Sequence, residues 1–436
     1  MSQPRRTLIV GTAGRDFHVF NTIFRQDPHH TVLGFTSSGL RHGSARYPGC
    51  LAGPLYPDGI PIVPEADLEA FIHAERVDNV VFAYTELGCM EIARLAARVL
   101  AAGADFQLLS PSRLMLAANR PVIAVTAART GAGKSPTVRY LADLLLAEGR
   151  RVAVIRHPLR AADFGAGWSH RTSASSDADA CAEPEVAPLE GQPSVLVYSG
   201  TDQATVLAAA EADADVVLWD GAGNDLPFIR PDLHILLTDP LHVVGEAESF
   251  PGDVALRLAD VVMISKCDAA DAGQVDKVRA LVARLNPDAV VLTADSPVIV
   301  EGVELVAGKT VVVVEEELTL NLGSLRPGAG IAAAHKVGVS AIISPLPQAV
   351  GSLAGVYAQH PEAQSLLPVT GYSEAELAEV RETILATPSD GVIDATRVDL
   401  ASLLRLDRPV AKAWFALRPH DPEALAGLVR GVLRDR

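Results

Sequence analysis

The chain contains few cysteines and has less positive than negative charge. Its 436 residues include four cysteines, Cys50, Cys89, Cys181 and Cys267, and no two of them have the spacing of a zinc site or a redox pair. We therefore expect neither a disulfide framework nor a metal cluster, in keeping with a reducing compartment. The formal net charge is -16, from 37 Lys and Arg and 53 Asp and Glu. Because nucleic acid requires a positive surface, this charge argues against a nucleic-acid partner.

The chain also lacks a long hydrophobic run at its start. After Met1 to Thr7 comes an apolar stretch of about five residues, far shorter than a membrane span or the core of a secretory signal. We expect a soluble, cytoplasmic protein without membrane contact. Hydrophobic residues make up 49% and charged residues 21% of the chain, as in globular proteins. The length exceeds what one hydrophobic core usually serves, so we expect more than one domain.

The first part of the chain has the pattern of a small α/β domain. Short apolar runs, which predict strands, alternate with helical stretches such as 91–102. The predicted strands are 8–10, 31–35, 80–82 and 106–109. A proline-containing segment at 110–121 separates this region from the next. We therefore predict a Rossmann-like N-terminal domain, with a parallel sheet, over residues 1–118.

The middle of the chain has the pattern of a doubly wound α/β sheet. The predicted strands are 122–126, 151–155, 194–198, 216–219, 233–237 and 261–266, and the predicted helices are 135–148 and 203–212. This order is typical of a P-loop NTPase domain, which we place at residues 119–300. Residues 160–192 have weak periodicity and many small polar side chains, and they predict a long loop over the site.

The last part of the chain again mixes strand and helix patterns. The predicted strands are 310–314, 392–395 and 410–415, and a helix is predicted at 331–337. Ser373 and Glu376 have the spacing of a capping box at the start of another helix. We predict a C-terminal α/β region over residues 301–436, which would extend the central sheet.

A phosphate-binding loop follows the predicted strand at 122–126. Residues 128–135 read Ala-Arg-Thr-Gly-Ala-Gly-Lys-Ser and lead into an amphipathic helix. Backbone N–H groups of the loop would surround phosphates, Lys134 would reach the β and γ groups, and Ser135 would bind Mg²⁺. The nucleotide-binding residues of the loop would be Thr130, Gly131, Ala132, Gly133, Lys134 and Ser135. We therefore predict a protein that binds and cleaves ATP or GTP with Mg²⁺.

The first two residues of this loop are unusual. The common pattern has glycine at the position of Ala128, and alanine fits there if its φ is negative. Arg129 stands where one branch of P-loop proteins, including dimeric ATPases, carries an extra cation. Its guanidinium would stabilise the transferring phosphoryl group of its own or a neighbouring subunit, which predicts a homodimer or higher homo-oligomer. The alternative is a solvated loop arginine.

Two further segments have nucleotide-site patterns. Asp220 ends the apolar run 216–219 and would be the second Mg²⁺ ligand, so that Lys134, Arg129 and Asp220 form the catalytic set. A strand can also end in aspartate by chance. Residues 265–268 read Ser-Lys-Cys-Asp and are similar to the element with which GTPases bind guanine. Lys266 and Asp268 would then contact the nucleotide, unless this segment only caps a strand.

Together these motifs resemble the cyclic 2,3-diphosphoglycerate synthetase family. The matching segments are 11–18, 51–57, 127–135, 156–158, 219–225, 250–252, 328–330 and 349–352. The resemblance implies a P-loop NTPase of the dethiobiotin-synthetase and MobB-like branch. It also implies a ligase-like activity, in which cleavage of the triphosphate drives closure of an intramolecular phosphoanhydride in 2,3-diphosphoglycerate.

A phosphorylated substrate needs cations beyond those that hold the nucleotide. The candidate substrate-binding residues are Arg156, His157, Asn224, Asp225, Gly11, Gly14 and Arg15. Gly11, Gly14 and Arg15 would form a second anion site at a strand-to-helix turn, or a turn without a ligand. For His157 a structural role remains the alternative. The chain departs from the family pattern at Ala222, 241–246 and Ser265, so that another small anionic metabolite is also a candidate substrate.

A different class of function also fits part of the pattern. A GTPase switch or metallochaperone would act through a protein partner instead of making a product. The segment 265–268 favours this alternative, whereas the lack of a Cys and His cluster argues against it.

Overall fold

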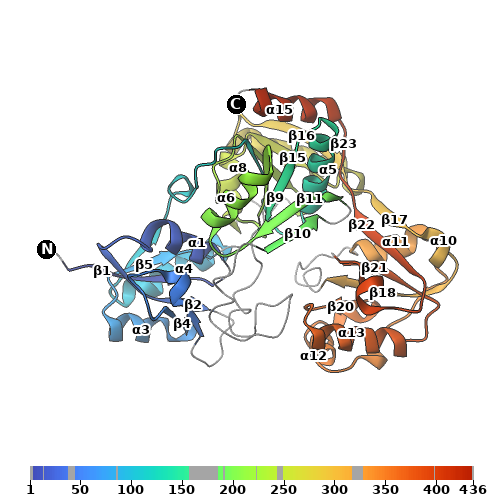
Figure 1. Cartoon of the computed structure of the whole chain (residues 1–436), viewed down its shortest axis with the longest axis horizontal. Coiled ribbons are helices and arrows are strands. Elements are labelled where there is room, and N and C mark those ends of the chain that lie inside the picture. The colour runs from blue at the N-terminus through green and yellow to red at the C-terminus, as the bar shows by residue number, and fades with distance from the viewer. Residues whose placement is uncertain are drawn as a thin grey trace. The chain divides into compact units, whose positions relative to one another are not determined.

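The computed structural model describes residues 3–12, 14–37, 45–84, 87–156, 185–189, 192–221, 223–242, 249–316, 328–396 and 398–434. The chain forms two compact units. The first comprises Met1–Asp295 together with Pro419–Arg436, and the second comprises Ser296–Arg418. The elements of each unit are labelled in Figure 1.

The described N-terminal residues form a six-stranded sheet with the order β3-β4-β2-β1-β5-β7. Its strands are β1 (Arg5–Val10), β2 (His30–Ser37), β3 (Ala45–Tyr47), β4 (Ile60–Pro64), β5 (Asn79–Phe82) and β7 (Asp105–Leu108), and its helices are α1 (Arg15–Val19), α2 (Gly49–Ala52), α3 (Leu68–Glu75) and α4 (Cys89–Ala101). All pairs are parallel except β3 with β4. Because β1 lies between β2 and β5, the winding direction changes at β1. Ligands of open α/β sheets bind outside the carboxyl ends of strands at such a point.

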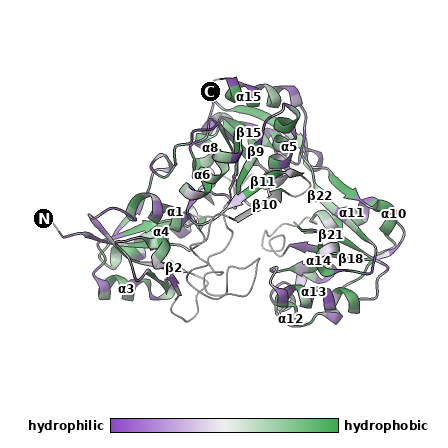
Figure 2. Ribbon diagram, in the orientation of Figure 1, coloured by the Kyte–Doolittle hydropathy of each residue, from purple (hydrophilic) through white to green (hydrophobic). Residues whose placement is uncertain are grey.

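A nine-stranded sheet follows, with the order β10-β11-β9-β12-β8-β13-β15-β16-β23 within the described part of the chain. The strands are β8 (Val122–Ala127), β9 (Val152–Arg156), β10 (Glu185–Leu189), β11 (Gln192–Ser199), β12 (Val216–Asp220), β13 (Leu233–Thr238), β15 (Val261–Ile264), β16 (Val290–Asp295) and β23 (Arg418–Pro419). The helices are α5 (Lys134–Ala147), α6 (Gln203–Asp213), α8 (Gly252–Leu258), α9 (Ala272–Leu285) and α15 (Pro422–Arg434). Strands β8, β12 and β13 are buried along their whole length. Figure 2 shows strands such as β9 and β15 largely in green, and α15 in both colours, as expected for a helix with one buried face.

The N-terminal sheet region and the nine-stranded sheet region of the first unit are in direct contact. β6 (Leu87–Gly88) pairs antiparallel with β14 (Ser249–Phe250). The ring of His18 stacks on Phe228 with 4.1 Å between centroids, and its Nε2 donates to the Leu114 carbonyl oxygen at 2.7 Å. These contacts bring the turn after β1 close to the segment that follows β12.

The second unit has its own sheet. Its described strands run in the order β17-β22-β21-β18-β19, and β20 also pairs with β18. They are β17 (Val298–Glu301), β18 (Thr310–Glu316), β19 (Ala341–Ile342), β20 (Leu367–Val369), β21 (Gly391–Ala395) and β22 (Val410–Phe415). The helices are α10 (Val303–Val306), α11 (Ala329–Val337), α12 (Leu353–Gln359), α13 (Glu374–Ala386) and α14 (Leu400–Leu404). The core includes fully buried valines of β18 together with Val392 and Ile393 of β21.

The predicted α/β class, with its P-loop sheet, is confirmed, and several details are corrected. The described strands after 300 form a separate sheet, because β17 pairs with β22; of these strands only β23 joins the central sheet. The segment from Pro419 belongs to the first unit and not to a C-terminal region running from 301 to 436. The predicted loop at 160–192 includes β10, which pairs with β11, whereas its part up to 184 lies outside the described residues.

The cysteine prediction also needs a correction. Cys89 and Cys267 are free, but Cys50 is disulfide-bonded. Sequence spacing misses such a bond because a disulfide depends on the distance between two Cα atoms in space. No described helix is long and apolar enough to cross a membrane.

Candidate active site at the P-loop

The loop between β8 and α5 has the backbone of a phosphate site. Gly131 and Gly133 have φ values of 83° and 104°, which favour glycine. Helix α5 begins directly after Gly133, and no side chain caps its first turn, so its amide groups are suited to an anion. Ala128 is not among the described residues with positive φ, which confirms that alanine fits this position. Ser135 is exposed in the first turn of the helix.

Lys134 lies against the segment that follows β12. Its Nζ donates a hydrogen bond to the carbonyl oxygen of Gly223. This contact brings the P-loop to the residues just before Asn224 and Asp225. Arg129 and Thr130 of the loop are half-buried.

Asp220 and Arg156 form an ion pair beside the P-loop. β12 lies between β8 and β9, and Asp220 is in register with Val125 on one side and Arg156 on the other. The Arg156 Nε and Nη2 atoms donate to Asp220 Oδ2 at 3.0 and 2.9 Å. The Asp220 side chain is 5% exposed and that of Arg156 is 29% exposed. Arg156 was predicted to bind substrate, and the structure places its guanidinium on the predicted metal-binding carboxylate. His157, the neighbouring candidate, lies outside the described residues.

The segment after β15 contacts the P-loop through Ser265. β15 ends at Ile264, before the predicted end of the strand, and Ser265 Oγ donates to the Ala132 carbonyl oxygen at 2.7 Å. The same hydroxyl lies 3.0 Å from the Thr238 carbonyl oxygen. Ser265 therefore joins the P-loop to the end of β13.

Lys266 and Asp268 occupy different environments. Lys266 has a left-handed backbone, with φ of 54°, and its Nζ donates to Asp239 Oδ2 at 2.7 Å. Asp268 is exposed. Asp239 was not predicted as a site residue, although it follows the apolar run of β13 as Asp220 follows that of β12. It is 1% exposed, so its carboxylate is a buried partner for Lys266.

The turn after β1 already contains a carboxylate. Gly11 and Gly14 have φ values of 133° and 115°. Asp16 Oδ1 accepts hydrogen bonds from the backbone N–H groups of Gly14 at 3.2 Å and Phe17 at 2.7 Å. A Cβ atom at Gly11 would lie 2.7 Å from Asp16 Oδ2. Part of the predicted backbone anion site is thus filled by Asp16, and the side chain of Arg15 is the remaining cation of this turn.

Arg15 is buried beside the segment after Asp220. It is 4% exposed, and burial lowers the pKa of its guanidinium, whereas the nearby carboxylates of Asp225 and Asp16 raise it. The guanidinium carbon lies 5.6 Å from the centre of the Phe250 ring. Arg15 Nε and Nη1 have no hydrogen-bond partner among the described residues, and the same is true of Oδ1 of the buried Asn224. The predicted residues Arg15, Asn224 and Asp225 are therefore close together.

These residues fit a nucleoside triphosphate and Mg²⁺. The uncapped start of α5 and the two left-handed glycines suit phosphate. The Ser135 hydroxyl and the Asp220 carboxylate are oxygen donors of the kind that Mg²⁺ prefers.

The comparisons with known proteins agree with this site. The family model "Cyclic 2,3-diphosphoglycerate synthetase, P-loop domain" matches residues 191–294. Arginine synthetase ArcE from Thermococcus kodakarensis is 42% identical over 418 residues, which cover 95% of this chain and 93% of ArcE. Cyclic 2,3-diphosphoglycerate synthetase from Methanothermobacter thermautotrophicus is 33% identical over 88 residues, or 20% of this chain and 19% of that protein.

Two more distant similarities cover parts of the chain. Tetraacyldisaccharide 4'-kinase from Geobacter sulfurreducens is 34% identical over 174 residues, which cover 36% of this chain and 47% of the kinase. A crystal structure of LpxK from Aquifex aeolicus in complex with ATP aligns with a TM-score of 0.42 and 14% identity, over 73% of this chain and 90% of that chain.

The fold, the P-loop and the similarity to ArcE define an NTP-dependent synthetase of the P-loop class. The chain belongs to the family that contains arginine synthetase ArcE and the cyclic 2,3-diphosphoglycerate synthetases. The resemblance predicted from the sequence motifs is thereby confirmed at the level of the family.

Proposed function

We propose that this chain uses the γ-phosphoryl group of ATP to convert a ureido amino acid and ammonia into arginine. The observation that carries the proposal is the 42% identity to arginine synthetase ArcE over 95% of this chain, because it includes both compact units. The similarity to the cyclic 2,3-diphosphoglycerate synthetase of Methanothermobacter thermautotrophicus covers only 20% of this chain.

The reaction needs an activated oxygen. The ureido oxygen attacks the γ-phosphorus, an O–P bond forms, the β–γ anhydride bond breaks, and ADP leaves. Ammonia then adds to the ureido carbon and loses a proton, and the C–O bond breaks with phosphate as the leaving group. One ATP is thus consumed for each guanidinium formed.

The residues beside the P-loop suit the first of these steps. Lys134 and the amide groups at the start of α5 would hold the phosphates, and Arg129 and Arg156 would stabilise the charge that spreads over the transferring group. Ser135 and Asp220 would hold Mg²⁺, which would supply positive charge against the phosphates. The ion pair between Arg156 and Asp220 supports this role, because it keeps a guanidinium at the phosphoryl end of the site.

A second candidate is the closure of a cyclic phosphoanhydride in 2,3-diphosphoglycerate. The match of residues 191–294 to the P-loop domain of that synthetase favours it. We do not propose the GTPase switch or metallochaperone, because the relative that covers nearly the whole chain is named as a synthetase. The choice of ATP over GTP is part of the proposal, and both nucleotides belong in its test.

The test is phosphorus NMR of the full chain with Mg²⁺ and ATP or GTP. One sample contains citrulline and ammonia, and another contains 2,3-diphosphoglycerate. We expect arginine, detected by chromatography, to form with equal amounts of nucleoside diphosphate and phosphate in the first sample only. A cyclic phosphoanhydride signal in the second sample, without arginine in the first, would replace our proposal by the second candidate.

We also propose a homodimer, in which Arg129 reaches the phosphoryl group of the neighbouring subunit. Its place in the P-loop, directly before the phosphate-binding residues, supports this arrangement. Sedimentation should show a dimer when the nucleotide is bound. Monomers at micromolar concentration, with and without nucleotide, would contradict the proposal.

A further inference from the structure

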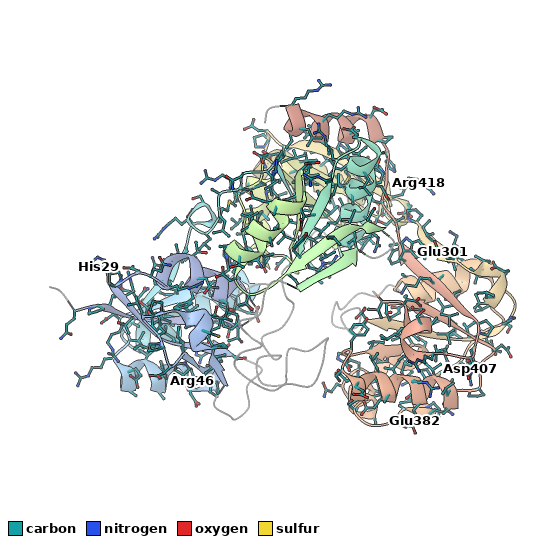
Figure 3. All side chains as sticks on the ribbon, in the orientation of Figure 1. His29, Arg46, Glu301, Glu382, Asp407 and Arg418 are labelled. Carbon is teal, nitrogen blue, oxygen red and sulfur yellow. The ribbon has the colours of Figure 1, made fainter. Side chains whose placement is uncertain are left out.

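Arg15 is the one lysine or arginine among the buried residues of the described chain. The other described lysines and arginines are exposed or half-buried, and the labelled residues His29, Arg46, Glu301, Glu382, Asp407 and Arg418 are all exposed in Figure 3. Burial of a guanidinium whose Nε and Nη1 lack partners is unfavourable for folding. A ligand that accepts hydrogen bonds from these atoms would account for the burial.

The place of Arg15 in the fold is that of a ligand-binding residue. It follows β1 at the point where the winding of the N-terminal sheet changes direction, which is where α/β sheets bind ligands. Asp225, whose carboxylate faces Arg15, is two residues after Gly223, and Gly223 accepts the hydrogen bond of Lys134. A ligand on Arg15 would therefore lie next to the phosphoryl end of the nucleotide site.

The charges around Arg15 discriminate between the candidate ligands. A guanidinium binds a carboxylate or a phosphate well, and Phe250 supports its flat face. However, two carboxylates, those of Asp16 and Asp225, lie near this one guanidinium, so that negative charge is in excess. A substrate with two phosphates would be repelled by both, whereas a zwitterion would bring a carboxylate to Arg15 and an ammonium to Asp225.

We propose that Arg15, Asn224 and Asp225 form the site for the α-amino acid part of the substrate, with the Arg15 guanidinium on the α-carboxylate and the Asp225 carboxylate on the α-ammonium. This assignment rests on the proposed synthesis of an amino acid. These three residues select a zwitterion over a bisphosphate. Arg15 is thus a specificity residue for the acceptor substrate and has no contact with the nucleotide.

The experiment compares ligands that differ only in the α-carboxylate. Calorimetry of the full chain with Mg²⁺ and ADP measures the affinity of arginine against agmatine, and of citrulline and ornithine against their decarboxylated forms. The wild type should prefer each amino acid by about 10- to 100-fold, as expected for a charge-assisted pair. Arg15→Met should lose this preference, with the affinity for ADP and for the decarboxylated forms unchanged.

Three controls keep the test specific. Arg15→Lys should restore part of the preference, because it returns the charge without the planar geometry. Arg98→Met removes an arginine that is paired with Glu69 on the surface and should behave as the wild type. Unchanged ADP affinity in Arg15→Met shows that this variant is folded.

The outcomes separate this inference from the proposed function. If the wild type makes arginine but Arg15→Met keeps the preference for amino acids, the function stands and the inference is wrong. If the wild type makes no arginine but binds another amino acid through Arg15, the function is wrong and the inference stands. Binding of 2,3-diphosphoglycerate but of no amino acid to the wild type would overturn both.

Discussion

Two histidines of the first unit are buried in their neutral form. Burial lowers the pKa of His18 to about 4, and the same cause lowers the pKa of His234 to about 4. His234 Nε2 lies 2.7 Å from Thr126 Oγ1, beside the strand that leads into the P-loop. The unfolded chain binds these protons at higher pH than the folded chain. The contribution of the two neutral histidines to the free energy of unfolding is therefore fully present above about pH 6.5. It falls as the pH decreases towards 4.

The first prediction concerns this acid sensitivity. Between pH 7.5 and pH 5, His18 should reduce the free energy of unfolding by about 2 kcal/mol. His18→Gln should remove this part of the loss, because glutamine does not gain a proton. Urea unfolding at both pH values measures the difference, and His29→Gln, which changes an exposed residue, serves as the control. An unchanged pH dependence in His18→Gln would show that His18 is not neutral in the folded protein.

The second prediction concerns Lys134. Lys134→Ala should reduce turnover at least about 100-fold, as for the loss of one preorganised group that stabilises transferring charge. The melting temperature should stay close to that of the wild type, because the half-buried lysine is not part of a hydrophobic core. Lys277→Ala on the exposed face of α9 is the matched control. Normal turnover in Lys134→Ala would contradict the assignment of residues 128–135 as the phosphate-binding loop.

At the scale of elements, the P-loop is held by the segment after β15. Ser265→Ala deletes the hydroxyl that donates to the Ala132 carbonyl oxygen and lies 3.0 Å from that of Thr238. We expect the KM for the nucleotide to rise about 5-fold, equivalent to about 1 kcal/mol for a lost hydrogen bond, with a smaller effect on kcat. Ser112→Ala, at an exposed turn, should have no effect on either constant. A fall in kcat alone would instead place Ser265 in the chemical step.

The elements that were predicted correctly have strong local patterns. β8, β12 and β13 are continuous apolar runs that are buried on both faces, and the capping box of Ser373 and Glu376 is present at α13. Several strands are absent from the prediction, among them β16, β17 and β23. They are short, or their residues are only partly buried, so that hydrophobic periodicity is weak.

The site was predictable to the same extent. The P-loop and Asp220 are local motifs. The pairing of Asp220 with Arg156 depends on the order of β8, β12 and β9, and the burial of Arg15 depends on packing between two sheets. Asp239 directly follows a mostly apolar strand, as Asp220 ends one, so the sequence contains a signal for this residue as well.

At the scale of the molecule, the second unit is an insertion within the first. The chain leaves the first unit after Asp295 and returns at Pro419. The two crossing points are adjacent, because His420 Nε2 lies 2.8 Å from Asp295 Oδ1 and the His420 N–H donates to the Thr293 carbonyl oxygen at 2.9 Å. Insertions with ends this close are tolerated because the host fold is not stretched.

The last prediction follows from this arrangement. Replacement of Ser296–Arg418 by a short Gly and Ser linker should leave a folded first unit with unchanged affinity for ATP, measured by calorimetry. Deletion of α15 should instead lower the melting temperature, because Leu425, Ala426 and Val429 are buried in the first unit. Loss of ATP binding in the linker variant, with retained binding in the α15 deletion, would contradict the division into units.

The ion pair between Arg430 and Glu148 connects α15 to the end of the P-loop helix α5, with 2.6 Å between Nε and Oε1. During translation the ribosome makes α5 first, then the whole inserted unit, and only afterwards α15. Nascent domains usually fold as units as they emerge. The inserted unit can therefore fold before α15, the last helix of the first unit, has been synthesised. A chain that is truncated before residue 419 lacks β23 and α15, so that its P-loop sheet is incomplete.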